Sequence, residues 1–343
     1  MKNLLNRIIV TGLLAVSVFL AAQPNRPLGD SKVWASVPLP GYPEGIAMKG
    51  NTVYVSGPAA FGIFTPPVVW AYDRRDGTLK EQYPVTIGNP FVPFRALSCI
   101  AFGPDGKLYA IEPFVGVIRM DLNPGNSQQV YSAFPPPPPT GALPNDLVFD
   151  QSGNLYVTDS FQGLIYKIPA GGGPPQVWFQ DARLLGNPAL PFGANGIRID
   201  KTNTNLYVAV TVRNDFSGAI YRLPLVAAPN TGDLQEFHVY PPSAFGPPAP
   251  DGIAFGKSGK LYVALAVSNQ ISVLRPDGIQ EAVYSGAAQM TGGTLPWANP
   301  ANIAFHDQEG TILVTNHASL VPYDPALFAV FDVFVDDKGQ PLP

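Results

Sequence analysis

Four oxygen-bearing side chains stand at one equivalent position of a repeated sequence pattern. They are Glu44, Asn145, Asn195 and Asp251, and each precedes the first apolar residue of its repeat by two positions. Carboxylates and amides offer only oxygen ligands, which suit Ca²⁺, whereas Zn²⁺ prefers His or Cys. In tripeptides such as "PEG" or "PDG" each residue alone would be a common turn residue, but independent turns would not keep one register. The pattern predicts an open divalent cation site for Ca²⁺, with Mg²⁺ or another divalent ion as the alternative.

Six copies of one pattern must position these residues. Each copy has an apolar triplet, a short polar turn and a strand similar to "LYV", and two further alternating segments follow. Repeats of about 50 residues with four short strands are typical of β-propeller blades. The sequence therefore predicts an all-β, six-bladed β-propeller with four antiparallel strands per blade. The first apolar residues of the repeats are Ile46, Ile100, Leu147, Ile197, Ile253 and Ile303.

The two ends of the chain are expected to close the ring. The last repeat stops after three strands, and the early segment 32–38, "KVWASVP", resembles the outer-strand segment "QVWFQ" of the third repeat. We therefore expect segment 32–38 to supply the missing outer strand of the last blade, which would leave no unprotected inner edge. In such a ring the first strand of each repeat is innermost, so the four oxygen-bearing side chains would converge at one end of the axis.

Composition limits the classes of partner. The 343 residues are 46% hydrophobic and 13% charged, and 21 Lys and Arg face 25 Asp and Glu for a net charge of −4. Without a basic cluster, the sequence argues against nucleic acid and against a membrane surface as partners. Cys99 is the only cysteine, which excludes an intrachain disulfide and cysteine-rich zinc sites. We expect a monomer that takes a small-molecule substrate.

The N-terminus has the layout of a secretory signal. Lys2 and Arg7 precede an apolar run over residues 8–20, and two alanines follow at 21 and 22. This apolar run is short for a membrane span. The sequence predicts a signal peptide at 1–22, a propeller domain at 23–343 and a secreted or periplasmic location, with an uncleaved anchor as the alternative.

The six repeats and the acid-amide-amide-acid order of Glu44, Asn145, Asn195 and Asp251 resemble a known family. They are similar to the calcium-dependent propeller hydrolases of the SMP-30/gluconolactonase/LRE-like group, which also holds diisopropyl-fluorophosphatase, paraoxonase and related lactonases. The resemblance implies that these four residues hold a catalytic Ca²⁺ and that the protein hydrolyses a lactone, an ester or a phosphotriester. It also implies a dual role for Asp251, as ligand and as either nucleophile or general base, and a ligand role alone for Glu44.

Residues at the ends of the second strands form a further candidate group on the same face. Asp159 in "LYVTDS" could act as a base or bind substrate, although a solvated acid at a strand end is an equal alternative. Asn316 occupies the corresponding place in the last repeat, and His317 follows it. Fluorophosphatase-like relatives place a histidine near the pocket in this blade, so the resemblance implies a catalytic role for His317, with a structural histidine as the alternative.

The connectors on this face are rich in proline and aromatic residues. Such residues could line a pocket for an acyl or aryl group, or else pack between neighbouring loops. Two features depart from the patterns of the relatives. Gly45 and a second blade without histidine differ from the paraoxonase pattern, which disfavours a second buried calcium. Leu143 differs from the gluconolactonase pattern, which disfavours sugar-acid lactones as substrates. We expect a moderately hydrophobic lactone or ester as substrate, with aryl esters or phosphotriesters as side substrates. The expected pocket residues are Phe64, Phe94, Phe134, Phe192, Phe245, Trp297 and Asn316.

Two other functions stay open at this point. A noncatalytic binding propeller could use calcium only to tie its blades together. A strictosidine-synthase-like enzyme would need a glutamate in the sixth blade, and the last glutamate of the chain is Glu309, in a turn segment.

Overall fold

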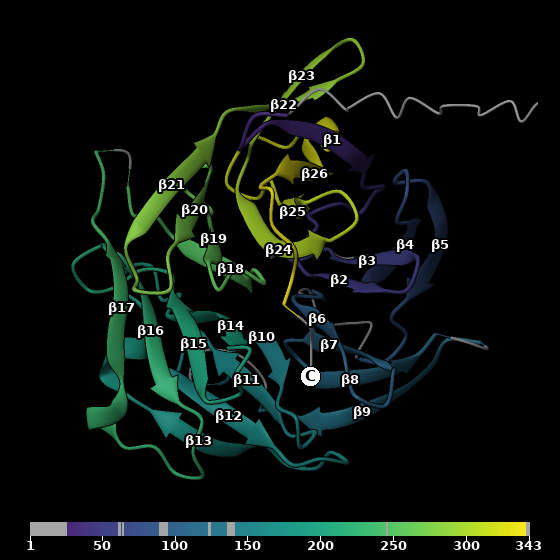
Figure 1. Ribbon diagram of the computed structural model, residues 1–343. Helices are drawn as coiled ribbons and strands as arrows, with labels where there is room; N and C mark the ends of the chain where they lie inside the picture. The colour runs from purple at the N-terminus through teal and green to yellow at the C-terminus, as the bar shows by residue number, and fades with distance from the viewer. Residues whose placement is uncertain are drawn as a thin grey trace, which may run out of the picture.

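Six β-sheets surround a common axis like the blades of a propeller (Figure 1). The computed structural model describes residues 26–60, 63, 65–88, 95–122, 125–135, 141–244 and 246–340. In the first five blades, four antiparallel strands follow the chain order from the axis outward, and the last blade is a six-stranded sheet that combines strands from both ends of the chain. Within the described residues there is no α-helix, and three short 3-10 helices are the only helical segments. The structure confirms the predicted six-bladed, all-β propeller.

The strands of the first three blades follow the repeat pattern of the sequence. Alternating apolar residues form each strand, and Gly-containing turns such as the one at Gly153, where φ is +80°, join them. The strands are β2 (Ile46–Lys49), β3 (Thr52–Gly57), β4 (Val68–Asp73), β5 (Leu79–Pro84), β6 (Ile100–Phe102), β7 (Leu108–Glu112), β8 (Gly116–Asp121), β9 (Ser127–Ala133), β10 (Pro144–Phe149), β11 (Leu155–Asp159), β12 (Leu164–Ile168) and β13 (Gln176–Gln180).

Blades four to six repeat the arrangement, and the last blade contains strands from both ends of the chain. The strands are β14 (Ala194–Ile199), β15 (Asn205–Val210), β16 (Gly218–Pro224), β17 (Gln235–Tyr240), β18 (Pro250–Phe255), β19 (Leu261–Leu265), β20 (Gln270–Leu274), β21 (Gln280–Ser285), β24 (Pro300–His306), β25 (Thr311–Asn316), β26 (Ala329–Phe334) and β1 (Ser31–Ser36). The 3-10 helices are η1 (Ala182–Leu184), η2 (Thr231–Asp233) and η3 (Pro325–Leu327).

Strand β1 closes the ring by pairing antiparallel with β26, with Ser31 opposite Val333. Arg26 reinforces this closure, because its Nη1 donates to Oδ1 of the buried Asp332 at 2.6 Å. The structure thus confirms the outer strand predicted for segment 32–38. It also adds a hairpin that the sequence analysis did not predict, β22 (Ala287–Met290) and β23 (Gly293–Pro296), whose first strand runs parallel to β1.

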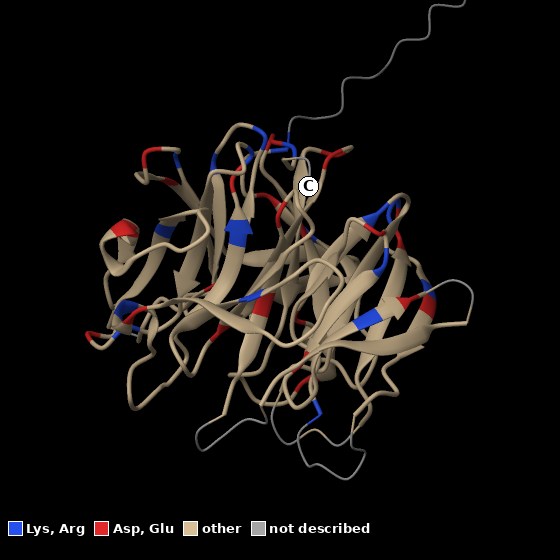
Figure 2. Ribbon diagram, turned by 90° about the horizontal axis from the view of Figure 1, so that it is seen from below, with Lys and Arg blue, Asp and Glu red and all other residues tan. Residues whose placement is uncertain are grey.

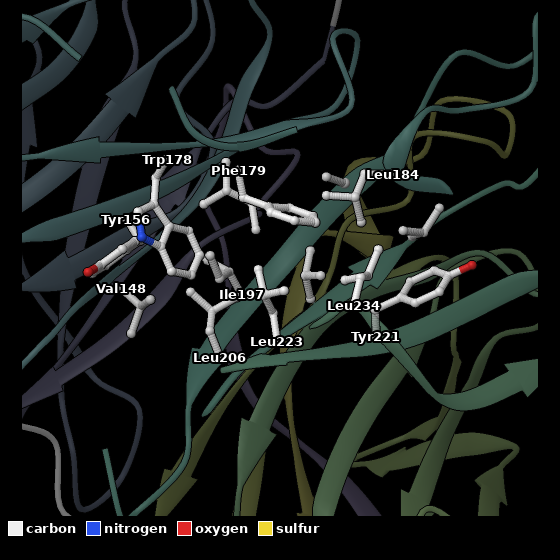
Figure 3. Close-up of a cluster of buried hydrophobic side chains, with 14 of the residues drawn as sticks. Val148, Tyr156, Trp178, Phe179, Leu184, Ile197, Leu206, Tyr221, Leu223 and Leu234 are labelled. Atoms are coloured by element: carbon white, nitrogen blue, oxygen red, sulfur yellow. The ribbon is translucent and has the colours of Figure 1, made fainter. Parts of the chain in front are cut away.

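Six hydrophobic clusters fill the spaces between neighbouring blades. Figure 3 shows the cluster between blades three and four, where Tyr156 and Trp178 of one blade face Leu206 and Leu223 of the next. The rings of Tyr156 and Trp178 meet edge to face, with centroids 4.9 Å apart. Burying a large apolar side chain contributes about 1.5–3 kcal/mol, so packing between the blades holds the inner strands in place around the axis.

Figure 2 shows charged residues on several blades and on many of the connecting loops. Lys and Arg are scattered among the blades and are interspersed with Asp and Glu. Within the described part of the chain, no helix has the length and the apolar character that a membrane-spanning helix needs.

Candidate metal and active site

Irregularities at the start of the inner strands place the predicted ligands at one end of the axis. In β10, β14 and β18 the pairing with the second strand shifts register between the first residue and the fourth. Asn145, Asn195 and Asp251 each lie inside such an irregularity, and Glu44 lies two residues before β2. A bulge of this kind redirects a side chain away from the regular sheet. The four residues, called here the quartet, therefore occupy equivalent places in blades one, three, four and five.

Hydroxyl groups of neighbouring blades fix the backbone of the quartet. Thr315 Oγ1 donates to the carbonyl oxygen of Glu44 at 2.7 Å, and Thr158 Oγ1 donates to that of Asn195 at 2.7 Å. Gly196 allows the blades to approach closely here, because a Cβ at this position would lie 2.2 Å from the carbonyl oxygen of Asp251. The inner strands at the quartet are thus in direct contact from blade to blade.

The two amides of the quartet are oriented by residues that directly follow the second strands of their blades. Asn145 Nδ2 donates to Ser160 Oγ at 3.1 Å, and Asn195 Nδ2 donates to Thr211 Oγ1 at 2.9 Å. Each of these bonds fixes the amide so that Oδ1 points the other way. Both Oδ1 atoms are buried and accept no hydrogen bond from the described residues. Because a buried acceptor without a partner is costly, these two oxygens are ready to bind a cation.

The two carboxylates of the quartet disfavour each other's charge. Burial, followed by repulsion from Asp251 and Asp146, raises the pKa of Glu44 well above its usual range. Asp251 is partly buried, and this partial burial together with the negative charge of Asp146 raises its pKa to about 8, while a hydrogen bond from Asn195 opposes the rise. Without a cation, these carboxyl groups therefore keep their protons to higher pH than ordinary carboxyl groups do. A divalent ion would relieve the repulsion.

His317 lies beside the quartet, as the family resemblance implied for this blade. Its Nε2 is 3.0 Å from the carbonyl oxygen of Ala59, an acceptor, so Nε2 carries the hydrogen. Its Nδ1 lies 3.1 Å from Ser319 Oγ and 3.4 Å from Oε2 of Glu44. Burial lowers the pKa of His317 to about 4, so the ring is neutral at neutral pH and adds no positive charge to the site. Its catalytic role stays a prediction.

Asp159 and Asn316, at the ends of the second strands of blades three and six, hold the turns beside them. Asp159 Oδ1 accepts hydrogen bonds from the backbone N–H groups of Leu143, Phe161 and Gln162, at 2.9 to 3.2 Å. Asn316 likewise accepts from the N–H of Ala298 and donates to the carbonyl oxygen of Leu327. Asp159 is buried, which differs from the solvated alternative, and its Oδ2 has no hydrogen-bond partner among the described residues.

The expected aromatic pocket residues are divided by the structure. Phe134 and Trp297 belong to core clusters, where Phe134 packs edge to face on Tyr166 and Trp297 stacks on Phe331. Phe192 is partly exposed on the face of the quartet, with its ring 5.7 Å from that of Phe161. Phe64, Phe94 and Phe245 lie outside the described residues, as does the predicted signal peptide at 1–22.

A depression of about 590 Å³ lies at the edge between blades three and four. It is lined by residues such as Asp181, Arg183 and Leu185, and it includes no residue of the quartet. This depression is therefore separate from the candidate metal site.

Three further residues near the quartet were not predicted from the sequence. Asp146, Arg198 and Asn302 come one to three residues after the quartet register, and they form a hydrogen-bonded group behind it in which Asp146 and Asn302 are buried and Arg198 is partly buried. One signal was available, because Arg198 stands where the other five repeats carry Ala or Val. The neighbouring Asp146 was hidden in the turn-like tripeptide "PND".

The donor set fits a hard cation. It consists of two carboxylates and two amide oxygens without other partners, all of them oxygen ligands, which are the ligands that Ca²⁺ and Mg²⁺ prefer. No three His, Cys, Asp or Glu side chains of the described chain are grouped so that they alone could hold a metal ion. The candidate site therefore depends on Asn145 and Asn195 as much as on the carboxylates.

Comparison with known proteins gives one family match. Residues 67–318 match the family model described as the SMP-30/gluconolactonase/LRE-like region. No curated protein matches the sequence.

Several solved structures share the fold. Regucalcin from Agrobacterium tumefaciens, described as a calcium-binding protein, has a TM-score of 0.63 at 18% identity, with 88% of this chain and 92% of that chain covered. A gluconolactonase from Xanthomonas campestris has a TM-score of 0.58 at 17% identity, with coverage of 92% and 91%. A luciferin-regenerating enzyme has a TM-score of 0.61 at 14% identity, with coverage of 87% and 92%. At these identities the structures demonstrate a shared propeller fold.

Proposed function

Because the chain belongs to the SMP-30/gluconolactonase/LRE-like family, we propose that it is an exported, Ca²⁺-dependent hydrolase of a moderately hydrophobic lactone or ester. One observation carries the proposal: the amides of Asn145 and Asn195 are held with Oδ1 free, beside two carboxylates that repel each other. The gluconolactonase among the structural neighbours supports the reaction class, and regucalcin supports the choice of ion. The apolar N-terminal run over residues 8–20 supports export.

The quartet residues would have different roles. A bound Ca²⁺ would polarise the substrate carbonyl and stabilise the negative charge that develops on its oxygen during attack. Glu44 is buried behind His317 and serves as a ligand. Asp251 is partly exposed, so water and substrate can reach its carboxylate, which then accepts a proton from the attacking water or attacks the carbonyl carbon itself. In the first route the C–O bond of the ester breaks and the leaving oxygen takes up the proton, and in the second a water molecule then hydrolyses the acyl–Asp251 bond, so both routes consume one water and leave an acid and an alcohol group.

Apolar groups near the quartet support a moderately hydrophobic substrate. Phe161 and Phe192 pack together on this face, and Leu190 and Phe216 are exposed on neighbouring loops, at 42% and 44%. An acyl chain or aryl group that covered these side chains would remove apolar surface from water.

Calcium removal tests this proposal directly. We expect EDTA to abolish hydrolysis of at least one member of a panel of lactones, aryl esters and phosphotriesters, and excess Ca²⁺ to restore it. Melting should be followed in the same samples. Chelation that lowers the melting temperature without any turnover on the panel would favour a noncatalytic, calcium-stabilised propeller, and turnover unaffected by EDTA would contradict the metal mechanism.

Replacing Thr211 with valine is expected to weaken calcium binding. The variant keeps the size of the side chain but removes the oxygen that accepts from Asn195 Nδ2, so the amide is free to rotate away. Loss of one such hydrogen bond corresponds to about 1 kcal/mol, or a roughly five- to tenfold rise in Kd measured by calorimetry. Thr202→Val, in an exposed turn of the same blade, is the matched control and should bind Ca²⁺ like the wild type. Equal calcium affinities in Thr211→Val and Thr202→Val would mean that the hydrogen bond to Thr211 is not needed to orient the Asn195 amide.

A further inference from the structure

Four hydrogen-bonded side chains, called here the crossbar, lie behind the quartet: Asp146, Arg198, Asn302 and Cys99. Arg198 Nη1 donates to Asp146 Oδ2 at 2.7 Å, and Arg198 Nη2 donates to Asn302 Oδ1 at 3.3 Å. Asn302 Nδ2 in turn lies 3.0 Å from Sγ of Cys99. These residues come from blades three, four, six and two, and blades three and six stand on opposite sides of the ring (Figure 1). The guanidinium of Arg198 therefore crosses the axis.

The crossbar is largely buried and is in electrostatic contact with the quartet. The side chains of Asp146 and Arg198 are 1% and 17% exposed. Asp146 also accepts from the backbone N–H groups of Leu147 at 2.8 Å and Ile197 at 3.0 Å, which ties blade three to blade four. The charge of Asp146 raises the pKa of Glu44 and of Asp251, so the crossbar and the quartet interact electrostatically.

The C-terminal segment covers the opposite end of the inner strands. Gln340 Nε2 donates to the carbonyl oxygen of Ile199 at 2.7 Å, and the backbone N–H of Gln340 donates to that of Phe255 at 3.1 Å. Ile199 and Phe255 are the last residues of β14 and β18. The crossbar lies behind the quartet, and the C-terminal segment covers the far ends of β14 and β18. We therefore expect a cation to enter from the face of the quartet.

We propose that Arg198 is a positioning residue that acts as a built-in cation, neutralising Asp146 so that the site takes a single divalent ion. This inference rests on the proposed function. When ionised, Glu44, Asp251 and Asp146 carry three negative charges and Arg198 carries one positive charge, which leaves −2 to match one Ca²⁺. The neutral His317 does not change this balance. Without Arg198, the buried carboxylate of Asp146 would face the same space unpaired and would attract the ion more strongly.

Four variants, with calcium as the probe, test this role. Arg198→Met replaces the guanidinium with an apolar side chain of similar length, and Asp146→Asn removes the opposite charge. The double variant removes both charges. Arg222→Met is the matched control, because Arg222 lies on β16 of the same blade and contacts Gln235 at the exposed outer strands. Melting temperatures in EDTA and in Ca²⁺, and calorimetric Kd values at pH 8, are measured for each.

We expect Arg198→Met to melt about 5 °C lower than the wild type in EDTA, because a buried charge has lost its partner. Its Kd for Ca²⁺ should fall about tenfold, and Ca²⁺ should raise its melting temperature more than that of the wild type. The double variant should recover most of the loss in EDTA. A merely structural role would lower the melting temperature but would not tighten calcium binding.

The other possible results of these measurements overturn either the inference about Arg198 or the proposed function. If Arg198→Met matches Arg222→Met, or if the effects of the two charge changes simply add, the inference is overturned while the proposed function stands. If Arg198→Met does not fold, the double variant must bind Ca²⁺ more tightly than Asp146→Asn alone, and equal binding overturns the inference. A wild-type chain that binds no Ca²⁺ would overturn the proposed function and this inference together.

Discussion

Replacing Asp251 with asparagine is expected to lower hydrolysis by about a thousandfold or more, because it removes both a metal ligand charge and the carboxylate that handles the attacking water. Calcium affinity should fall as well, since only one carboxylate of the quartet remains. Steady-state rates on the best substrate of the panel and calorimetric titration with Ca²⁺ measure the two effects.

The fold of this variant should survive. Asp251 is a carboxylate whose charge the metal-free site disfavours, so a neutral amide should leave the melting temperature in EDTA equal to that of the wild type or higher. Asp277→Asn is the matched control: it lies in the same tripeptide, "PDG", in an exposed turn where it contacts Arg275. Full activity in Asp251→Asn, or an equal loss in Asp277→Asn, would rule out the proposed role.

Calcium affinity is expected to rise steeply with pH. The pKa of Asp251 is about 8 in the metal-free site, so protons compete with Ca²⁺ below this pH. Between pH 6 and pH 8 the ionised fraction of such a group grows about fiftyfold, and the apparent affinity should grow with it. Glu44, whose pKa is also raised, would steepen the rise. Titrations at pH 6, 7 and 8 measure this effect, and calorimetry in buffers of different ionisation enthalpy measures the protons released.

The stability of the metal-free protein should change in the opposite direction. A carboxyl group whose pKa is raised on folding keeps its proton in the native state while the unfolded chain has already lost it. The native state binds more protons between the ordinary pKa near 4 and the raised value of about 8, so the free energy of unfolding falls as pH rises through this range. In EDTA we expect a lower melting temperature at pH 8.5 than at pH 5.5, and Ca²⁺ should remove most of the difference. A calcium affinity and a melting temperature that do not change with pH would contradict a cation site formed by carboxyl groups with raised pKa values.

Much of the fold was predictable because a propeller blade is a local structure. The turns and alternating apolar residues that form β10 to β13 lie within about 40 residues of chain, and so the pattern is visible in the sequence. Even the long-range closure by β1 had a local signal, since segment 32–38 resembles an outer strand. The hairpin β22–β23 was missed because its turn residues, Thr291 and Gly292, stand within a connector that reads as a loop.

The candidate site was predictable only in part. The register of Glu44, Asn145, Asn195 and Asp251 follows from the repeat, since equivalent residues of a ring must meet at one end of its axis. The sequence alone therefore determined which side chains are the candidates to face a cation.

Only the tertiary structure decided how those side chains are held. The orientation of the Asn195 amide depends on Thr211, and the neutralisation of Asp146 depends on Arg198, which reaches across the axis to Asn302. Such contacts join residues 16 to 104 positions apart, and their partners follow no repeat. Apolar periodicity records which face of a strand is buried, but it does not record which polar groups meet when the ring closes, because that depends on the geometry of all six blades together.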